Sequence, residues 1–217
     1  MNDHKICFIA CVNNDNYEQE RLKYLNHLIV PHGFEVESLS VCEAESMAAG
    51  YNEGMRSSDA KYKVYLHQDV FIVNPNFIHD ILDIFREKNI GMVGMVGAPK
   101  LPENSIMWNM PRVGKLYVNL IYQSHKSVFG GIEGRYQQVE AIDGLLMATQ
   151  YDLPWREDLF HNWDFYDVSQ SQEFIRRGYQ VVVPSQRQPW CIHDDGFNNL
   201  KNYYEARRIF QREYRNV

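Results

Sequence analysis

The sequence predicts an α/β protein with a mostly parallel sheet that is covered by helices on both faces. Short apolar runs rich in β-branched residues alternate with longer segments of helical periodicity through residues 5–96, an order typical of parallel sheets. Apolar residues make up 45% of the 217-residue chain, which is enough to fill a core. No repeat or linker divides the sequence, so we expect residues 1–217 to form a single domain.

The first half of the chain contains the most regular pattern. Its predicted strands are the apolar runs at residues 5–12, 62–66 and 90–96 and the alternating segment at residues 34–41. Its predicted helices carry apolar residues on one face and cover residues 17–29, 44–56 and 76–86. Polar residues 13–16 are suited to capping the first helix, and the segment 31–33 with its proline and glycine ends it.

The pattern loosens between residues 98 and 140. Pro99, Pro102, Pro111 and the glycine-rich stretch 130–134 predict a long excursion with one hairpin at about residues 115–122. Loops of this length inside a compact domain are usually functional or mobile. Regular structure is expected again in the segment 140–149, a helix at 164–177, a strand at 179–183 and a helix at 200–214.

Charge and hydropathy exclude some classes of partner. The formal net charge is −6, whereas proteins that bind nucleic-acid backbones are usually basic, so we expect no nucleic-acid partner. The apolar run at residues 6–12 is too short for a signal peptide or a membrane span, and no other stretch reaches span length. We therefore expect a cytoplasmic protein, with peripheral attachment to a membrane left open.

The carboxyl ends of the predicted strands are the place to search for chemistry, because open parallel sheets bind ligands there. The first strand is followed by Asn13 and Asn14 rather than by a G-x-G-x-x-G loop, which argues against a dinucleotide-dependent dehydrogenase. The sequence also contains no G-x-x-x-x-G-K-[ST] motif, so a P-loop nucleotide site is excluded.

Three polar clusters remain as candidates. His67, Gln68 and Asp69 follow the third strand, where a carboxylate can hold a hard cation that bridges two phosphates, or can simply form a solvated turn. Asp167 lies in the first turn of a predicted helix, where a carboxylate often only complements the helix dipole. His193 follows an apolar run and leads an acidic turn at residues 194–196, which suits a metal ligand better than most histidine positions.

Taken in order, four segments resemble the inverting family-two glycosyltransferases with the GT-A fold, and more narrowly a bacterial group whose metal motif reads His-Gln-Asp. Residues 47–54 (MAAGYNEG) resemble an A-x-x-x-N-x-G helix beneath the nucleotide, and residues 65–69 (YLHQD) stand at the D-x-D motif. Residues 142–148 (IDGLLMA) resemble the segment before the acceptor region. Tyr166 and Asp167 stand where the family has Glu-Asp, eleven residues before a Gly-Tyr pair.

This resemblance implies a GT-A fold and the transfer of a sugar from a nucleotide-diphosphate donor to a hydroxyl of a carbohydrate or glycolipid acceptor. It implies a Mn²⁺ or Mg²⁺ ion held by Asp69 and His193, with Asp167 as the catalytic base. Two positions depart from the family pattern, because His67 replaces the first aspartate of D-x-D and Tyr166 replaces the glutamate. The residues expected to contact the nucleotide sugar are Asn13, Glu43, Asn52, Gln68, Asp69, Asp143 and Gly144.

Three expectations follow for the structure. Asp69 and His193, each expected to follow a strand at the same edge of the sheet, should approach within roughly 6 Å so that they can share one ion. Asp164, three residues before Asp167, is the competing base. The excursion at residues 98–140 should form the acceptor-side wall and be mobile without ligand; Trp108 and Tyr117 within it would face a sugar or, equally, a second subunit of a homo-oligomer.

Two other functions stay open at this point. The departures at His67 and Tyr166 are compatible with a non-catalytic domain that binds nucleotide sugars or carbohydrates. A sugar nucleotidyltransferase is less well supported, because such enzymes usually open with a glycine-rich loop after the first strand and this chain has Asn13-Asn14-Asp15 there.

Overall fold

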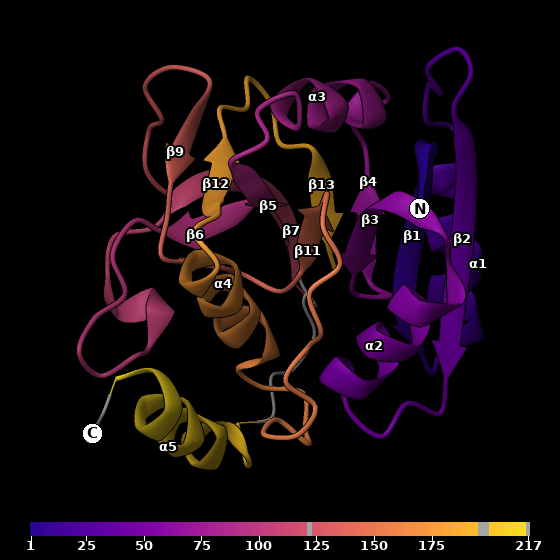
Figure 1. Ribbon diagram of the computed structural model, residues 1–217. Helices are drawn as coiled ribbons and strands as arrows, with labels where there is room; N and C mark the ends of the chain where they lie inside the picture. The colour runs from indigo at the N-terminus through magenta and orange to yellow at the C-terminus, as the bar shows by residue number, and fades with distance from the viewer. Residues whose placement is uncertain (121–122, 195–199, 216–217) are drawn as a thin grey trace.

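The computed structural model describes residues 1–120, 123–194 and 200–215 and consists of two sheets with helices packed around them (Figure 1). The larger sheet has seven strands, in the order β2 (Glu35–Cys42), β1 (Asn2–Val12), β3 (Ala60–Leu66), β11 (Leu146–Thr149), β5 (Ile90–Gly94), β12 (Gln180–Pro184) and β9 (Tyr136–Gln138). The smaller sheet has the order β10 (Ala141–Ile142), β6 (Val96–Ala98), β7 (Val113–Leu120), β13 (Cys191–His193) and β4 (Val70–Ile72), and β8 (Gln123–Val128) pairs with β7.

Five α-helices and one 3₁₀ turn complete the described part of the chain. They are α1 (Asp15–Leu25), α2 (Met47–Ser57), α3 (Phe77–Ile84), the 3₁₀ turn η1 (Met107–Asn109), α4 (Tyr166–Arg176) and α5 (Tyr203–Tyr214). The side chain of Asn14 caps α1 by accepting hydrogen bonds from the N–H groups of Asn16 and Tyr17. The hydroxyl of Ser46 caps α2 through the N–H of Ala49, at 3.1 Å.

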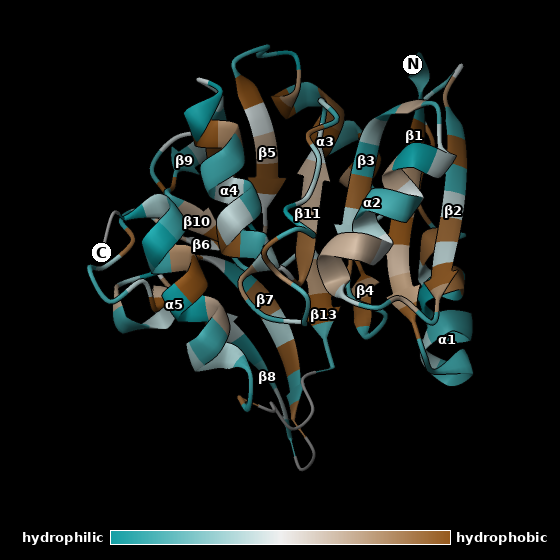
Figure 2. Cartoon of the chain, turned by 60° about the horizontal axis from the view of Figure 1, so that its bottom comes forward, coloured by the Kyte–Doolittle hydropathy of each residue, from teal (hydrophilic) through white to brown (hydrophobic). Residues whose placement is uncertain are grey.

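The larger sheet separates two hydrophobic cores, because alternate residues of a strand point to opposite faces. Phe8 of β1 joins the core that contains residues of α1 and α3. Its neighbour Ile9 joins the core that contains residues of α2 and α4. Figure 2 shows part of this contrast, with hydrophobic stretches in β5 and β11 and largely hydrophilic colouring in α1.

The predicted fold class is confirmed, with helices on both faces of a mixed sheet whose first strands are parallel. The sheet is less uniformly parallel than the pattern suggested, because β11 runs antiparallel to both of its neighbours, β3 and β5. The predicted strand at 90–96 is interrupted at Met95, so β5 and β6 belong to different sheets.

The excursion at residues 98–140 contains more regular structure than expected. β7 and β8 pair antiparallel as a hairpin, which lies further along the chain than predicted, because its second strand covers residues 123–128 rather than ending at 122. Residues 121–122 lie outside the described part of the chain. The same segment also contains η1 and the short strand β9, neither of which was predicted. Among the described residues, no helix combines the length and apolar character needed to cross a bilayer.

Candidate functional site

A pocket of about 410 Å³ lies beyond the carboxyl ends of β1, β2 and β3. Four of the predicted donor-contacting residues line it: Asn13, Glu43, Gln68 and Asp69. The other lining residues include Met47 of α2, His67 and the indole of Trp163, a side chain that is 49% exposed. The pocket therefore occupies the position where open α/β sheets bind their ligands.

Gln68 joins the ends of β1 and β3 at the edge of this pocket. Its side-chain oxygen accepts hydrogen bonds from the N–H groups of Asn13 and Asn14, at 3.0 and 3.1 Å. Its amide nitrogen donates to the side-chain oxygen of Asn13, at 2.7 Å. The amide of Gln68 is thus engaged with the protein, and a contact between Gln68 and a donor sugar stays a prediction.

Glu43 follows β2 with a φ of 55°, in the left-handed region that residues other than glycine seldom occupy. Such a conformation costs on the order of 1–3 kcal/mol and persists only where the surrounding structure enforces it. The strained backbone directs the chain from β2 around the pocket toward α2, and Glu43 itself is exposed and lines the pocket.

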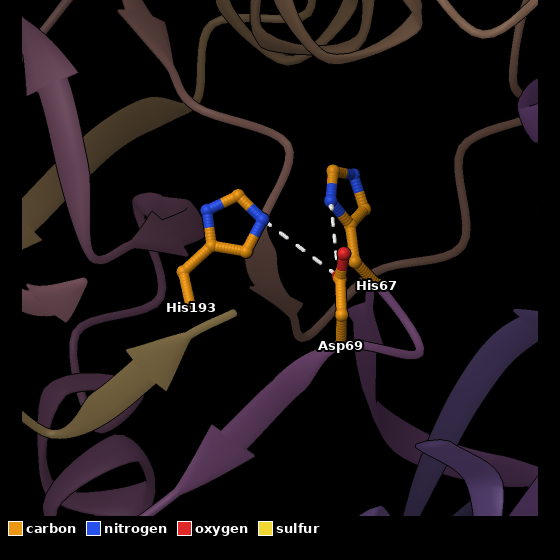
Figure 3. A group of neighbouring side chains, drawn as sticks. All are labelled: His67, Asp69 and His193. Atoms are coloured by element: carbon orange, nitrogen blue, oxygen red, sulfur yellow. Dashed lines mark ion pairs between the residues drawn. The ribbon is translucent and has the colours of Figure 1, made fainter. Parts of the chain in front are cut away.

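His67, Asp69 and His193 form a compact cluster on one side of the pocket (Figure 3). The Oδ1 atom of Asp69 lies 3.7 Å from Nε2 of His193 and 3.9 Å from Nδ1 of His67. This oxygen is buried and has no hydrogen-bond partner. A buried carboxylate oxygen without a partner, facing two imidazoles, fits a divalent cation, because a cation would satisfy it and both rings.

The predicted convergence of Asp69 and His193 is confirmed, but the reason for it differs from the one expected. His193 does not follow a strand of the larger sheet, because it is the last residue of β13 in the smaller sheet. β13 pairs antiparallel with β4, which places His193 opposite Val70. The N–H of Asp194 also donates to the carbonyl oxygen of Asp69, at 2.9 Å. The remainder of the predicted acidic turn, residues 195–196, lies outside the described residues.

Burial controls the charges of this cluster. It raises the pKa of Asp69 above its usual value, although nearby His193 opposes the shift. Burial also lowers the pKa of His67 to about 4, and the neighbouring His193 adds to that effect. The imidazole of His67 is therefore neutral near pH 7, the form in which histidine binds metals.

Asp167 lies at the start of α4, where its carboxylate accepts hydrogen bonds from the N–H groups of Gly144 and Val168, at 2.9 and 2.8 Å. Burial raises its pKa to about 7, and the nearby carboxylate of Asp143 contributes to the increase. Asp164 lies before the first residue of α4, and only burial raises its pKa. Asp167 thus has the stronger physical basis for accepting a proton near neutral pH.

The two departures from the family pattern contact each other. The hydroxyl of Tyr166 forms a hydrogen bond with Nε2 of His67, although 99 positions separate the two residues. Gly144 makes room for this contact, because a Cβ at that position would lie 2.1 Å from the hydroxyl oxygen of Tyr166. The predicted ligands were Asp69 and His193 alone; His67 belonged to the same candidate cluster, and its spacing of two residues from Asp69 was the signal that could have added it to the set.

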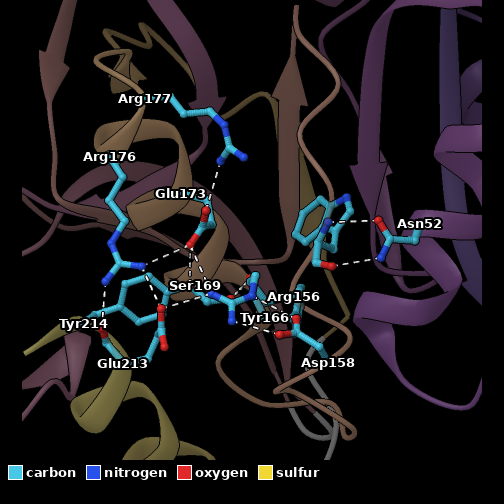
Figure 4. A network of polar contacts seen from close by, with 11 residues as sticks. Asn52, Arg156, Asp158, Tyr166, Ser169, Glu173, Arg176, Arg177, Glu213 and Tyr214 are labelled. Atoms are coloured by element: carbon cyan, nitrogen blue, oxygen red, sulfur yellow. Dashed lines mark hydrogen bonds and ion pairs between the residues drawn. The ribbon is translucent and has the colours of Figure 1, made fainter.

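Asn52 and Gly144 lie outside the lining of the pocket, as do Asp143 and Asp167. Asn52 is 1% exposed, and its side chain exchanges two hydrogen bonds of 2.9 Å with the main chain of Trp155 (Figure 4). In this structure Asn52 therefore attaches α2 to the loop before α4. Its predicted contact with a nucleotide stays a prediction.

A strand-end pocket beside a possible cation site and a carboxylate of raised pKa is suited to a group-transfer enzyme. The sequence profile described as "Glycosyltransferase like family" matches residues 7–214. The chain therefore belongs to this glycosyltransferase-like family. A search of curated proteins found none that matches it.

Solved structures of GT-A glycosyltransferases have the same fold. A mannosyltransferase of Pyrobaculum calidifontis, in complex with GDP-Man and Mn²⁺, aligns with a TM-score of 0.60 at 13% identity, over 98% of this chain and 64% of that one. S. aureus TarS 1-349 in complex with UDP aligns with a TM-score of 0.57 at 11% identity, over 96% of this chain and 65% of that one. The chain thus spans just under two thirds of the length of these structures.

Proposed function

We propose that the protein is an inverting, metal-dependent glycosyltransferase that moves a sugar from a nucleotide-diphosphate donor to an acceptor hydroxyl. The observation that carries this proposal is the meeting of Asp69 and His193 beside the strand-end pocket, at 3.7 Å between Oδ1 and Nε2. Membership of the glycosyltransferase-like family supports it independently of that geometry.

The donor occupies the pocket at the ends of β1, β2 and β3. Asn13 and Glu43 line it, which supports the proposal that they contact the base and ribose. Asp69 and His193 would hold a divalent cation, and Mn²⁺ or Mg²⁺ bound there would supply positive charge to balance the diphosphate leaving group. The Mn²⁺ and nucleotide sugar in the complex of the P. calidifontis mannosyltransferase support this class of ligand.

Asp167 acts as the base. Its carboxylate accepts the proton of the acceptor hydroxyl while that hydroxyl attacks the anomeric carbon from the face opposite the diphosphate. Two backbone N–H groups hold the carboxylate in place, and its pKa of about 7 suits proton uptake at neutral pH. One base and one displacement give inversion at the anomeric carbon.

The acceptor, a carbohydrate or glycolipid, approaches along the excursion at residues 98–140. Trp108 of η1 is 48% exposed and packs on Tyr203 of α5 with 4.8 Å between ring centroids, which supports a role in stacking against a sugar ring. Trp108→Ala should raise the acceptor KM while leaving the donor KM unchanged. Unchanged kinetics together with the loss of a dimer would assign Trp108 to a subunit contact instead.

A thermal-shift screen of nucleotide sugars with and without Mn²⁺ tests the proposed function. A donor at a hundredfold excess over its Kd should add about 2.7 kcal/mol to the free energy of unfolding, and only in the presence of the ion. Asp69→Asn, which removes the charge facing His193, should abolish the ion-dependent part of the shift. If no nucleotide sugar stabilises the wild type with Mn²⁺ present, the proposal is wrong.

A further inference from the structure

The cluster contains one more potential ligand than the proposed mechanism uses. We propose that His67 is a third metal ligand, that the resulting set of two histidines and one carboxylate selects Mn²⁺ over Mg²⁺, and that Tyr166 is the positioning residue of the His67 ring. This inference rests on the proposed function for its biological role, but the binding of the ion can be measured without a donor or an acceptor.

The geometry of the cluster accommodates one ion. One ligand atom from each of the three side chains can be chosen so that all lie within 4.8 Å of one another. Two ligand atoms that are each ~2.1 Å from one ion are separated by about 3.0–4.2 Å in octahedral coordination. The separations of 3.7 and 3.9 Å from Asp69 Oδ1 to the two rings fall in that interval. Figure 3 shows the carboxylate facing both rings.

Tyr166 determines which nitrogen of His67 faces the ion. Its hydroxyl occupies Nε2 of His67, so Nδ1 is the atom that faces Asp69. Metal-bound histidines generally use their second ring nitrogen in such a hydrogen bond, which fixes the ring and its tautomer. With an ion at Nδ1, the proton lies on Nε2 and is donated to the oxygen of Tyr166.

Tyr166 is itself held firmly. Its side chain is 4% exposed, and its ring packs edge-on against Tyr51 of α2 with 5.8 Å between centroids. The absence of a side chain at Gly144 leaves the space that the hydroxyl of Tyr166 occupies. The orientation of the His67 ring is thus set by a neighbour that cannot readily move away.

The chemistry of the ligand set determines the preferred ion. Mg²⁺ favours oxygen ligands in near-ideal octahedral geometry and gives up its water reluctantly. Imidazole nitrogen suits first-row transition ions, whose affinity for a given site rises from Mn²⁺ toward Cu²⁺. Two imidazoles and a single carboxylate therefore disfavour Mg²⁺, whereas an aspartate in place of His67 would make the set more favourable for it.

Titration of the protein alone with Mn²⁺, followed by the loss of the free-ion EPR signal, tests the inference without any catalytic readout. His67→Ala should weaken Mn²⁺ binding at least tenfold, and Tyr166→Phe should weaken it by about 10- to 100-fold. At least a tenfold excess of Mg²⁺ over Mn²⁺ should be needed to displace half of the bound Mn²⁺. The exposed residues His79 and Tyr204 provide matched controls, because His79→Ala and Tyr204→Phe should bind Mn²⁺ as the wild type does.

A further variant, His67→Asp, keeps the test valid if His67→Ala does not fold, as judged by circular dichroism. It should bind Mn²⁺ but require less Mg²⁺ for displacement than the wild type. Wild-type affinity in folded His67→Ala, displacement by equimolar Mg²⁺, or no Mn²⁺ binding by the wild type would each overturn the inference. Intact Mn²⁺ binding by a wild type that neither binds nor cleaves a nucleotide sugar would instead count against the proposed function alone.

Discussion

At the scale of single residues, the neighbouring carboxylates of Asp167 and Asp143 determine the pH at which the proposed base is ionised. Partial burial of Asp167 raises its pKa to about 7, and the charge of Asp143 disfavours its ionised form further. The N–H groups of Gly144 and Val168 oppose this shift by donating to the carboxylate. Asp167 is therefore balanced between its two forms at neutral pH, as a general base requires.

The pH dependence of turnover follows from this balance. Because the base acts in its ionised form, kcat should rise with pH and reach half its maximum at a pH of about 7. Asp143→Asn removes the neighbouring negative charge, lowers the pKa of Asp167 and should move the midpoint to lower pH. The test is to measure kcat of the wild type and of Asp143→Asn from roughly pH 5 to 9. A midpoint that stays in place or moves to higher pH in the variant would show that Asp143 does not raise the pKa of Asp167.

Close packing of α2 against β1 shapes the pocket at the level of secondary-structure elements. A Cβ at Gly50 would lie 2.4 Å from the sulfur of Cys11, and a Cβ at Gly54 would lie 2.4 Å from Cγ2 of Ile9. The two glycines, one helical turn apart, therefore let the helix approach the strand. The segment 47–54 that resembles a nucleotide-binding helix is thus also a packing surface.

Gly54→Ala tests this packing. The added methyl group would overpack the contact with Ile9, so the free energy of unfolding should fall by about 1–3 kcal/mol. Gly131→Ala is the matched control, because a Cβ at Gly131 meets nothing within 4 Å and the change should be within about 0.5 kcal/mol. Urea unfolding of the three proteins provides the comparison, and equal stabilities of the two variants would contradict the packing argument.

A network of charges attaches α5 to α4, the helix that begins with Tyr166 and Asp167 (Figure 4). Glu173 lies at its centre: one carboxylate oxygen accepts from the hydroxyl of Tyr214 at 2.9 Å, and the other accepts from Arg177 at 3.0 Å. Arg156 and Arg176 complete the cluster, both also contacting Glu213 of α5. The side chain of Glu173 is only 11% exposed, so water screens these contacts weakly.

Glu173→Gln should therefore weaken the attachment of α5. Loss of the charge leaves three arginines with a weaker acceptor, and the free energy of unfolding should fall by about 1–3 kcal/mol. Faster amide exchange should appear in α5 before it appears in the larger sheet. Glu205→Gln, at an exposed position of α5, is the matched control and should leave both measurements unchanged; equal effects of the two variants would show that the network does not hold the helix.

For the molecule as a whole, the sequence predicts the elements whose signal is local. Apolar runs mark β1 and β3, alternation marks β2, and helical periodicity marks α1 to α5, because burial of a face imposes its own spacing. Strands of two or three residues, such as β4, β10 and β13, are too short to show any period. The direction of β11 was also hidden, because a strand buried on both faces has the same pattern whether it is parallel or antiparallel.

The candidate site, too, could be predicted from the sequence only where its signal is local. Asp69 was identifiable because it lies three residues after the end of β3. Its meeting with His193 was also predicted, although the pairing of β4 with β13 is what brings the two residues together. The contact of His67 with Tyr166 depends on how β3 and α4 come together, which no local pattern contains. Helical spacing places Asn52 on a buried face but does not reveal that the main chain of Trp155 is its partner.

The most direct test of the central claim is the release of nucleoside diphosphate from nucleotide sugars, measured for the wild type, Asp167→Asn and Asp164→Asn in the presence of Mn²⁺. The wild type should turn over at least one donor, and Asp167→Asn, which keeps the shape but removes the base, should lower turnover by ~10²–10⁴ with donor binding nearly intact. Asp164→Asn should retain turnover, because Asp164 lies before α4 and lacks the neighbouring carboxylate that helps raise the pKa of Asp167. A wild type that binds a donor without cleaving it, or an Asp167→Asn variant with wild-type turnover, would contradict the account.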